Sequence, residues 1–281
     1  MILTAPPGLL DIDHPADHNA ADPLARKASV STPTDNSRPF GYRLAIHLLR
    51  PIFMVLTRRS WTGAENLPTE GGWVVVTNHN SHLDPLFFAH YLVDHGRSPR
   101  FLGKVEVFRV PVVGAELRAA DNIPVHRESG QAVDAFRSAV EAVRDNKCVA
   151  IYPEGTLTRD PGLWPMRGKT GAARVALETG CPVVPVAHWG AQDVLAPYAK
   201  VPHLFPRRTV HVRAGAPVPL DDLLGRPITS EVLQEATARI MAALTAVLEE
   251  LRDEEAPLER FDPRRHGITS IGRPKPLEEA S

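Results

Sequence analysis

The chain has 281 residues, of which 43% are apolar and 23% charged, and its formal net charge is −1. These values are ordinary for a globular protein with one α/β domain and extra segments, or with two small domains. A nearly neutral chain has no strong overall field to attract nucleic acid, so we expect no nucleic-acid partner. Because no apolar run reaches the roughly 18 residues of a spanning helix and the N-terminus does not resemble a signal peptide, we expect a chain that does not cross a membrane.

The two ends of the chain lack the pattern of a folded domain. Residues 1–38 are rich in Asp, Pro, Ala, His and Ser without an apolar period, and residues 256–281 carry prolines among charges. Segments of this composition bury too little apolar surface to offset the loss of chain entropy. We therefore predict a disordered tail over residues 1–38, a folded domain over residues 39–255 and a flexible tail over residues 256–281.

An unusual apolar segment opens the predicted domain. Residues 41–56 are mostly apolar, and the run is interrupted by basic residues and a proline, namely Arg43, His47, Arg50 and Pro51, and followed by Arg58 and Arg59. The pattern suits a basic amphipathic helix at a bilayer surface, and it equally suits a helix that packs on the domain. Pro51 should kink or split such a helix.

Strand-like and helical runs alternate after this segment. Short runs rich in β-branched residues predict strands over residues 73–77, 149–152, 183–187 and 209–213. Pro185 weakens the third of these because proline cannot donate to a strand ladder. Apolar residues three and four apart predict helices whose periodic positions begin near Val133, Ala173 and Leu233. The alternation predicts an α/β fold with a central mixed sheet flanked by helices.

A histidine and an aspartate follow the first predicted strand. If Asp84 accepts a hydrogen bond from one imidazole nitrogen of His79, the other nitrogen can act as a base. This is the histidine–aspartate half of a hydrolytic triad, and a substrate hydroxyl could be the missing nucleophile. Asp84 before Pro85 is also a good helix start. His79, His82 and Asp84 could instead bind a metal, although their spacing is not that of the helical zinc motifs.

Four blocks, in order, resemble the signatures of the glycerolipid acyltransferase family. They are Asn78-His79-x-Ser81-x-x-Asp84, Ile123-Pro124-Val125-His126-Arg127, Tyr152-Pro153-Glu154-Gly155-Thr156 and Val183-Val184-Pro185-Val186-Ala187. Lys104 lies in a segment similar to the family's Lys-x-Glu-Leu-Phe. The family usually continues the third block with Arg-Ser, whereas Leu157 and Thr158 follow here and Arg159 comes two positions after Leu157. The resemblance spans about residues 40–255.

The resemblance implies a 1-acylglycerol-3-phosphate O-acyltransferase. Such an enzyme moves a fatty acyl group from acyl-CoA or acyl carrier protein to the sn-2 hydroxyl of 1-acyl-glycerol 3-phosphate and so makes phosphatidic acid. It implies His79 as the general base and Asp84 as its partner, with no metal and no cofactor. The resemblance assigns the acceptor phosphate to Lys104, Arg127, Glu154, Gly155, Thr156 and Arg159. It also implies a lysophospholipid partner and a peripheral position on the cytoplasmic face of the cell membrane, where the amphipathic segment would contact lipid.

Two other functions remain open at this point. A related acyltransferase could use a different lyso-lipid or a glycolipid acceptor, and the loss of the family's arginine at Leu157 keeps this alternative alive. The chain could also be a non-catalytic membrane-binding protein.

Overall fold

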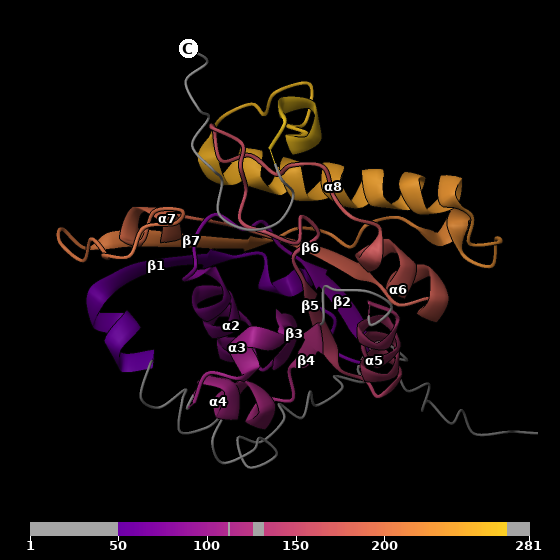
Figure 1. The fold of residues 1–281 in the computed structure, drawn as a ribbon, viewed down its shortest axis with the longest axis horizontal. Coiled ribbons are helices and arrows are strands. Elements are labelled where there is room, and N and C mark those ends of the chain that lie inside the picture. The colour runs from indigo at the N-terminus through magenta and orange to yellow at the C-terminus, as the bar shows by residue number, and fades with distance from the viewer. Residues whose placement is uncertain (1–49, 112, 126–131, 269–281) are drawn as a thin grey trace, which may run out of the picture. The chain divides into compact units, whose positions relative to one another are not determined.

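The computed structural model describes residues 50–111, 113–125 and 132–268. These residues form a seven-stranded sheet with the order β1-β7-β6-β2-β5-β3-β4 (Figure 1). The strands are β1 (Thr57–Thr62), β2 (Trp73–Val76), β3 (Pro99–Lys104), β4 (Ile123–Val125), β5 (Cys148–Ile151), β6 (Val183–Trp189) and β7 (Arg208–Ala214). All neighbouring strands are parallel except β6 and β7, which are antiparallel. The predicted α/β fold with a mixed sheet is confirmed.

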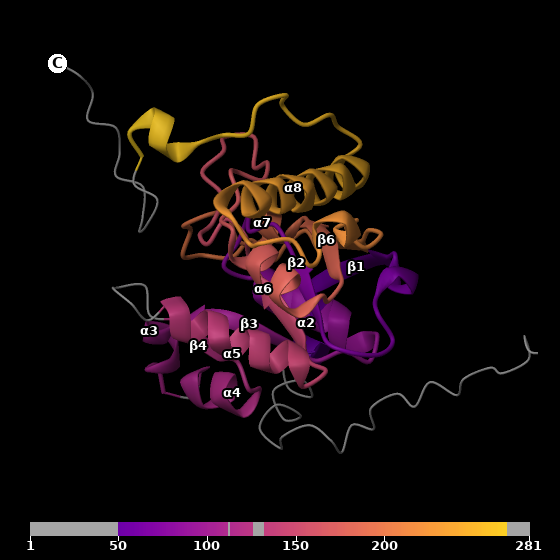
Figure 2. The same ribbon diagram turned by 90° about the vertical axis from the view of Figure 1, so that its right-hand side faces the viewer.

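Helices cover both faces of the sheet. After a short helix at residues 50–56, the described helices are α2 (Asp84–Asp94), α3 (Val105–Phe108), α4 (Val113–Ala119), α5 (Ala132–Arg144), α6 (Gly171–Thr179), α7 (Ala191–Val194) and α8 (Ser230–Arg252). Three-residue and four-residue 3-10 turns lie at Ala64–Asn66, Asp221–Leu223 and Pro263–His266. The long helix α8 lies over one face of the sheet and α2 over the other, as Figures 1 and 2 show. The predicted flanking helices are thus confirmed.

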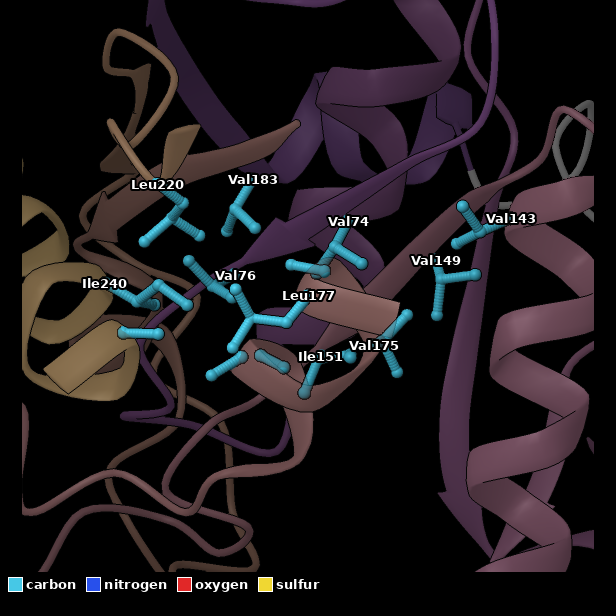
Figure 3. Packing of buried hydrophobic residues seen from close by; sticks show 14 of the residues in the cluster. Val74, Val76, Val143, Val149, Ile151, Val175, Leu177, Val183, Leu220 and Ile240 are labelled. Carbon is cyan, nitrogen blue, oxygen red and sulfur yellow. The ribbon is translucent and has the colours of Figure 1, made fainter. Parts of the chain in front are cut away.

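The central strand β2 is buried on both faces. Val74 and Val76 pack with residues of α5, α6 and α8, including Ile240 (Figure 3). Trp73 and Val75 pack on the other face with the aromatic side chains of α2. A strand that is covered on both faces reads as a continuous apolar run, which explains why residues 73–77 predict a strand without alternation.

Sequence patterns locate most of these elements. The four predicted strands correspond to β2, β5, β6 and β7, and the three predicted helices correspond to α5, α6 and α8. Pro185 fits within β6 because its carbonyl accepts from Gly215 on the β7 side, so its missing N–H lies just beyond the β6–β7 ladder, which begins at Val186. Val133 was expected on the buried face of its helix, yet it is 57% exposed. The buried apolar face of α5 therefore begins after Val133, with Ala135 buried and Phe136 partly buried.

The described chain begins in the segment predicted to contact a membrane. Residues 41–49 lie outside the described residues, as do residues 1–40, and residues 50–56 form a short helix. Phe53 packs edge-on against Phe87 of α2, with ring centroids 5.0 Å apart. Ile52, Met54 and Val55 are exposed. In the described part of the chain, no helix combines the length and the apolar character needed to span a bilayer.

Packed chain continues beyond the predicted domain boundary at residue 255. The Arg252 guanidinium at the end of α8 lies between the rings of Trp164 and Trp189, 3.8 and 4.2 Å from their centroids. The Arg167 amide then donates to the Phe261 carbonyl at 3.2 Å. Cation–π contacts of a desolvated arginine contribute about 2 kcal/mol or more each, so Arg252 holds the end of α8 against Trp164 and Trp189. The hydrogen bond to Phe261 joins the following segment to the loop before α6. Residues 269–281 lie outside the described residues.

The close approach of Gly190 to β7 can be tested by substitution. Gly190 has a φ of 101°, and a Cβ there would lie 2.1 Å from the Thr209 carbonyl oxygen. We predict that Gly190→Ala lowers the free energy of unfolding by about 2–4 kcal/mol, because strain and a backbone clash add. Urea unfolding monitored by circular dichroism measures the change. Gly225→Ala is the control, since Gly225 also has a positive φ but open space around it. Equal losses in the two variants would contradict the role of the clash.

Candidate active site

The parallel strands bring the sequence blocks to one edge of the sheet. β2, β5, β3 and β4 are neighbours and parallel, so their carboxyl ends face the same side, with strands about 4.8 Å apart. His79 follows β2, the turn 152–156 follows β5, and Lys104 is the last residue of β3. Val125 ends β4, and Arg127, two residues later, lies outside the described residues. This edge is where α/β sheets place reactive groups.

His79 and Asp84 form the predicted pair. The distance from His79 Nδ1 to Asp84 Oδ2 is 2.9 Å. The Asp84 side chain is fully buried and that of His79 is 17% exposed. Because the carboxylate accepts, Nδ1 carries the proton of the neutral ring and Nε2 keeps its lone pair. The arrangement supplies a base of the kind that removes a proton from a bound hydroxyl.

The turn between His79 and Asp84 holds the carboxylate in place. The backbone amides of Asn80 and Ser81 donate to the same Oδ2 atom at 2.5 and 2.7 Å. α2 begins at Asp84, with Leu83 as its N-cap residue and Pro85 in its first turn. The helix start predicted at Asp84 and Pro85 is confirmed to within one residue. Both sequence interpretations of Asp84, as helix start and as histidine partner, therefore hold together.

Tyr152, an aromatic residue of the third sequence block, packs against the imidazole ring of His79. The rings of His79 and Tyr152 are stacked, with centroids 4.2 Å apart and an interplanar angle of 29°. Tyr152 in turn lies 6.3 Å from Phe101 of β3 in a second stacked pair. The Thr158 amide also donates to the His79 carbonyl at 2.7 Å. The β2 and β5 loops are thus one unit at the site.

Glu154 is a buried support of this unit. Its side chain is 3% exposed, and Oε2 accepts from the Met166 amide at 3.0 Å. Burial, with a smaller contribution from the nearby Asp84 carboxylate, raises the pKa of Glu154 to about 8, although hydrogen bonds from the Met166 and His79 backbone and the Thr158 side chain oppose the shift. At neutral pH the acid form prevails. Through its contacts with the backbone of Met166 and of His79, the buried, neutral Glu154 side chain connects the loop before α6 to the turn that carries His79.

The remaining positions of the third block differ in what they can offer an anion. Gly155 has a φ of 70°, and a Cβ there would lie 2.6 Å from Lys169 Nζ, so the lysine ammonium lies directly against the turn. Thr156 is half-buried, whereas Leu157 is 3% exposed and points into the interior. Arg159, which was expected to replace the family's arginine, is 9% exposed. The structure therefore places Lys169, rather than a charge at position 157, beside Gly155.

Two residues at this site carried no role in the sequence interpretation. Lys169 lies in an Arg-Gly-Lys-Thr-Gly stretch that resembles a family segment, but 14 residues separate it from Gly155 and only the fold brings them together. His188 lies in β6 and contacts Asn78 and Asp84. Its signal was a lone histidine in an otherwise apolar strand.

The metal alternative receives no support from the residues in view. Among the described residues, no group of three or more His, Cys, Asp and Glu side chains is arranged to hold a metal ion. His79 is directed to Asp84, and the His82 ring meets Tyr198 edge-on at 6.3 Å. The three side chains of the proposed ligand set do not form a cluster.

The raised pKa of Glu154 makes stability depend on pH. The folded state binds the Glu154 proton up to about pH 8, whereas the unfolded chain releases it near pH 4.3, so the folded state holds more protons between these values. Stability from this group is full below about pH 4 and is lost as the pH rises to about 8. We predict that the free energy of unfolding of Glu154→Gln falls less than that of the wild type between pH 5.5 and pH 8.5, by a few kcal/mol. Urea unfolding at the two pH values measures this difference, and parallel pH dependences would contradict it.

Known proteins are similar to this chain in sequence and in fold. Residues 58–189 match the sequence model of the family described as Acyltransferase. A chloroplastic 1-acyl-sn-glycerol-3-phosphate acyltransferase of Brassica napus is 34% identical over 135 residues, which cover 47% of this chain and 38% of the relative. The 1-acyl-sn-glycerol-3-phosphate acyltransferase of Borreliella burgdorferi is 32% identical over 136 residues, which cover 47% of this chain and 51% of the relative. The chain thus spans about half of the length, or less, of these curated relatives.

A solved structure extends the likeness over more of the chain. The crystal structure of the 1-acyl-sn-glycerophosphate (LPA) acyltransferase from Thermotoga maritima superposes with a TM-score of 0.57 and 23% identity. The superposition covers 77% of this chain and 81% of the other, and it shows a shared fold. The matched sequence contains the His79–Asp84 pair and the Tyr152–Thr156 turn. Residues 58–189 of this chain are therefore similar to the acyltransferase family, in agreement with the motifs.

Proposed function

We propose that the chain is a 1-acylglycerol-3-phosphate O-acyltransferase that uses His79 and Asp84 as its general base. The observation that carries the proposal is the 2.9 Å contact between His79 Nδ1 and the buried Asp84 carboxylate at the edge where the family blocks converge. The names of the matched relatives support the acceptor, a 1-acyl-glycerol 3-phosphate. The product is phosphatidic acid, and the donor is acyl-CoA or acyl carrier protein.

The pair provides a complete route for the protons. His79 Nε2 takes the proton of the sn-2 hydroxyl as the hydroxyl oxygen attacks the thioester carbonyl. Asp84 holds the ring and stabilises the imidazolium that forms. As the tetrahedral intermediate collapses, the C–S bond breaks and His79 returns the proton to the leaving thiolate. The acyl group passes directly to the acceptor oxygen, so no residue of the protein is acylated. General base catalysis of this kind contributes roughly 10²–10⁴-fold.

The acceptor phosphate binds beside the Gly155 turn in this proposal. Lys169 supplies a charge next to Gly155, and Lys104 and Arg127 follow the neighbouring strands β3 and β4. The positive φ of Gly155 lets the backbone of the turn approach phosphate oxygens closely. Glu154 and Thr156 shape the turn, and the buried Arg159 adds positive charge behind it. Holding the phosphate fixes the sn-2 hydroxyl near His79, so these residues act on rate as well as on binding.

The surface around the helix at residues 50–56 supports membrane attachment. Exposed Ile52, Met54 and Val55 lie in residues 50–56. Arg58, Arg59 and Arg207 line an open surface cavity of about 490 Å³ next to this helix. Arg207 also donates to the Met54 and Thr57 carbonyls at 2.8 and 2.9 Å. Exposed apolar side chains with arginines nearby suit the headgroup region of an anionic leaflet, so we place the protein peripherally on the cytoplasmic face of the membrane.

A different phosphate-free acceptor is the second candidate. Leu157 is buried where the family usually carries an arginine, which removes one cation from the expected phosphate site. A lyso-lipid or glycolipid whose headgroup lacks phosphate would not require that cation. The two candidates predict different results of neutralising Lys169. The affinity for the acceptor falls if the acceptor carries a phosphate, and it stays the same if the acceptor carries none.

Removing the base should abolish acceptor-dependent turnover. We predict that purified wild-type protein releases CoA from palmitoyl-CoA only when 1-acyl-glycerol 3-phosphate is present, and that His79→Ala lowers this rate about 10²-fold or more. Thiol release detected with a chromogenic disulfide measures the rate. His82→Ala, which removes an exposed histidine of the same turn, should retain activity. Full activity in His79→Ala, or loss in His82→Ala alone, would contradict this assignment.

The Lys169 ammonium should govern the affinity for the acceptor. We predict that Lys169→Gln raises the KM for 1-acyl-glycerol 3-phosphate about 10-fold or more, because a charge-assisted hydrogen bond is worth roughly 1.5–3 kcal/mol. Lys169→Arg, which keeps the charge, should lose less. The KM for palmitoyl-CoA, measured in the same assay, is the internal control. An unchanged acceptor KM in Lys169→Gln would favour an acceptor without phosphate.

A further inference from the structure

A histidine that the proposed mechanism does not use lies behind the catalytic pair. His188 is 1% exposed and belongs to β6, on the sheet face that also carries Val184 and Val186 and is covered by α2. The other residues of β6 between Val183 and Ala187 are apolar. Burying an imidazole in such a strand costs desolvation that an apolar side chain would not incur. The contacts of this ring show what offsets that cost.

His188 and Asn78 are joined by three hydrogen bonds. His188 Nε2 donates to the Asn78 carbonyl at 2.7 Å. The His188 amide donates to Asn78 Oδ1 at 3.0 Å, and Asn78 Nδ2 donates to the His188 carbonyl at 2.9 Å. Asn78 is the residue immediately before His79. The imidazole therefore fixes the peptide group from which the base emerges.

The other nitrogen of the same ring faces the partner of the base. His188 Nδ1 lies 3.6 Å from Asp84 Oδ1. Neither atom has a hydrogen-bond partner within the described part of the chain. All the donors that reach Asp84 converge on its other oxygen, Oδ2. The His188 ring thus lies against Oδ1 of the Asp84 carboxylate, while Oδ2 is directed to His79.

The protonation state of His188 follows from these contacts. A carbonyl oxygen can only accept, so Nε2 carries a proton in every state of this ring. Burial lowers the pKa of His188, against the opposing effect of the Asp84 carboxylate and the Asn78 carbonyl. The charged or titratable groups that act on the ring are Asp84, the first residue of α2, and His79, from the segment between β2 and α2. At neutral pH the ring is neutral, with its single proton on the side of Asn78.

We propose that His188 is a positioning residue for the base, acting through Asn78 and Asp84. Its Nε2–H sets the carbonyl that precedes His79, and its ring blocks rotation of the Asp84 carboxylate, so the 2.9 Å contact between His79 and Asp84 is kept. The inference rests on the proposed function, in which His79 is the base. A positioning residue changes the rate of the chemical step and leaves the affinity for the acceptor nearly unchanged.

Two substitutions of equal shape test the donor on this ring. His188→Gln and His188→Met have the same unbranched length, but only glutamine can donate to the Asn78 carbonyl. We expect His188→Met to lower kcat roughly 10- to 100-fold with the acceptor KM within about 2-fold, and His188→Gln to recover most of this loss. Because methionine packs readily in apolar cores, the unpaired variant should still fold. The thiol-release assay with full-length protein and 1-acyl-glycerol 3-phosphate gives both constants.

A spectroscopic readout separates this inference from the proposed function. Proton–nitrogen NMR of the histidine side chains reports the His79 Nδ1–H held by Asp84, whether or not any acceptor is turned over. We expect this resonance in the wild type and in His188→Gln, and its loss or a clear shift in His188→Met. His90→Leu, which removes another buried histidine at a distant point of α2, should leave the resonance unchanged.

Each outcome has a distinct meaning. A lost resonance in His188→Met, retained in His188→Gln, supports the positioning role even if no lyso-lipid is acylated, in which case only the proposed function fails. If the glutamine and methionine variants behave alike in both measurements, His188 is a packing residue and the inference is overturned. A matching loss in His90→Leu would also overturn it, since any buried histidine would then have the same effect.

Discussion

A single buried oxygen, Oδ2 of Asp84, is the point on which this site depends. It accepts from His79 Nδ1 and from the amides of Asn80 and Ser81, while its side chain is fully withdrawn from water. Removing a carboxylate from water costs several kcal/mol unless donors replace the lost hydration. Two of the three donors are backbone groups of the turn itself, so the turn cannot form correctly without the carboxylate. The contacts of the Asp84 carboxylate that orient His79 therefore also stabilise the local fold of the turn.

The neighbouring carboxyl groups of Asp84 and Glu154 lie in different surroundings. Asp84 receives three donors on one oxygen. Burial raises the pKa of Glu154 to about 8, the Asp84 carboxylate adds a smaller effect, and the hydrogen bonds to Glu154 oppose the shift only in part. Divergent environments of this kind separate the roles of paired acids. With Glu154 neutral, its carboxyl group does not offset the positive charge that Lys169 places beside Gly155. The same neutral acid can support the loop before α6 without repelling a phosphate.

Local patterns predict part of this architecture, and contacts between distant segments account for the rest. β2 and β5 are short, continuous apolar runs, and the His79–Asp84 pair lies within six residues, so both can be read directly from the chain. β1, β3 and β4 escape prediction because arginine, glycine and proline interrupt their sequences, and these strands form where neighbours supply the ladder. His188 meets Asn78 across 110 residues, a contact that no local spacing encodes. Leu157 could be recognised as a departure from the family, but its burial and the approach of Lys169 required the fold.

Lys169 places a positive charge beside the Gly155 turn, although position 157 carries none. Leu157 joins the interior, so the residue after Thr156 cannot present a cation to the turn. Lys169 comes from the loop just before α6 instead, and its own amide donates to the carbonyl of Pro153, a residue of the same turn, at 2.8 Å. That backbone bond fixes the lysine relative to Gly155 independently of its flexible side chain. Glycine at position 155 then has two physical reasons, its positive φ and the space that the ammonium occupies, and a side chain there would displace the charge as well as strain the turn.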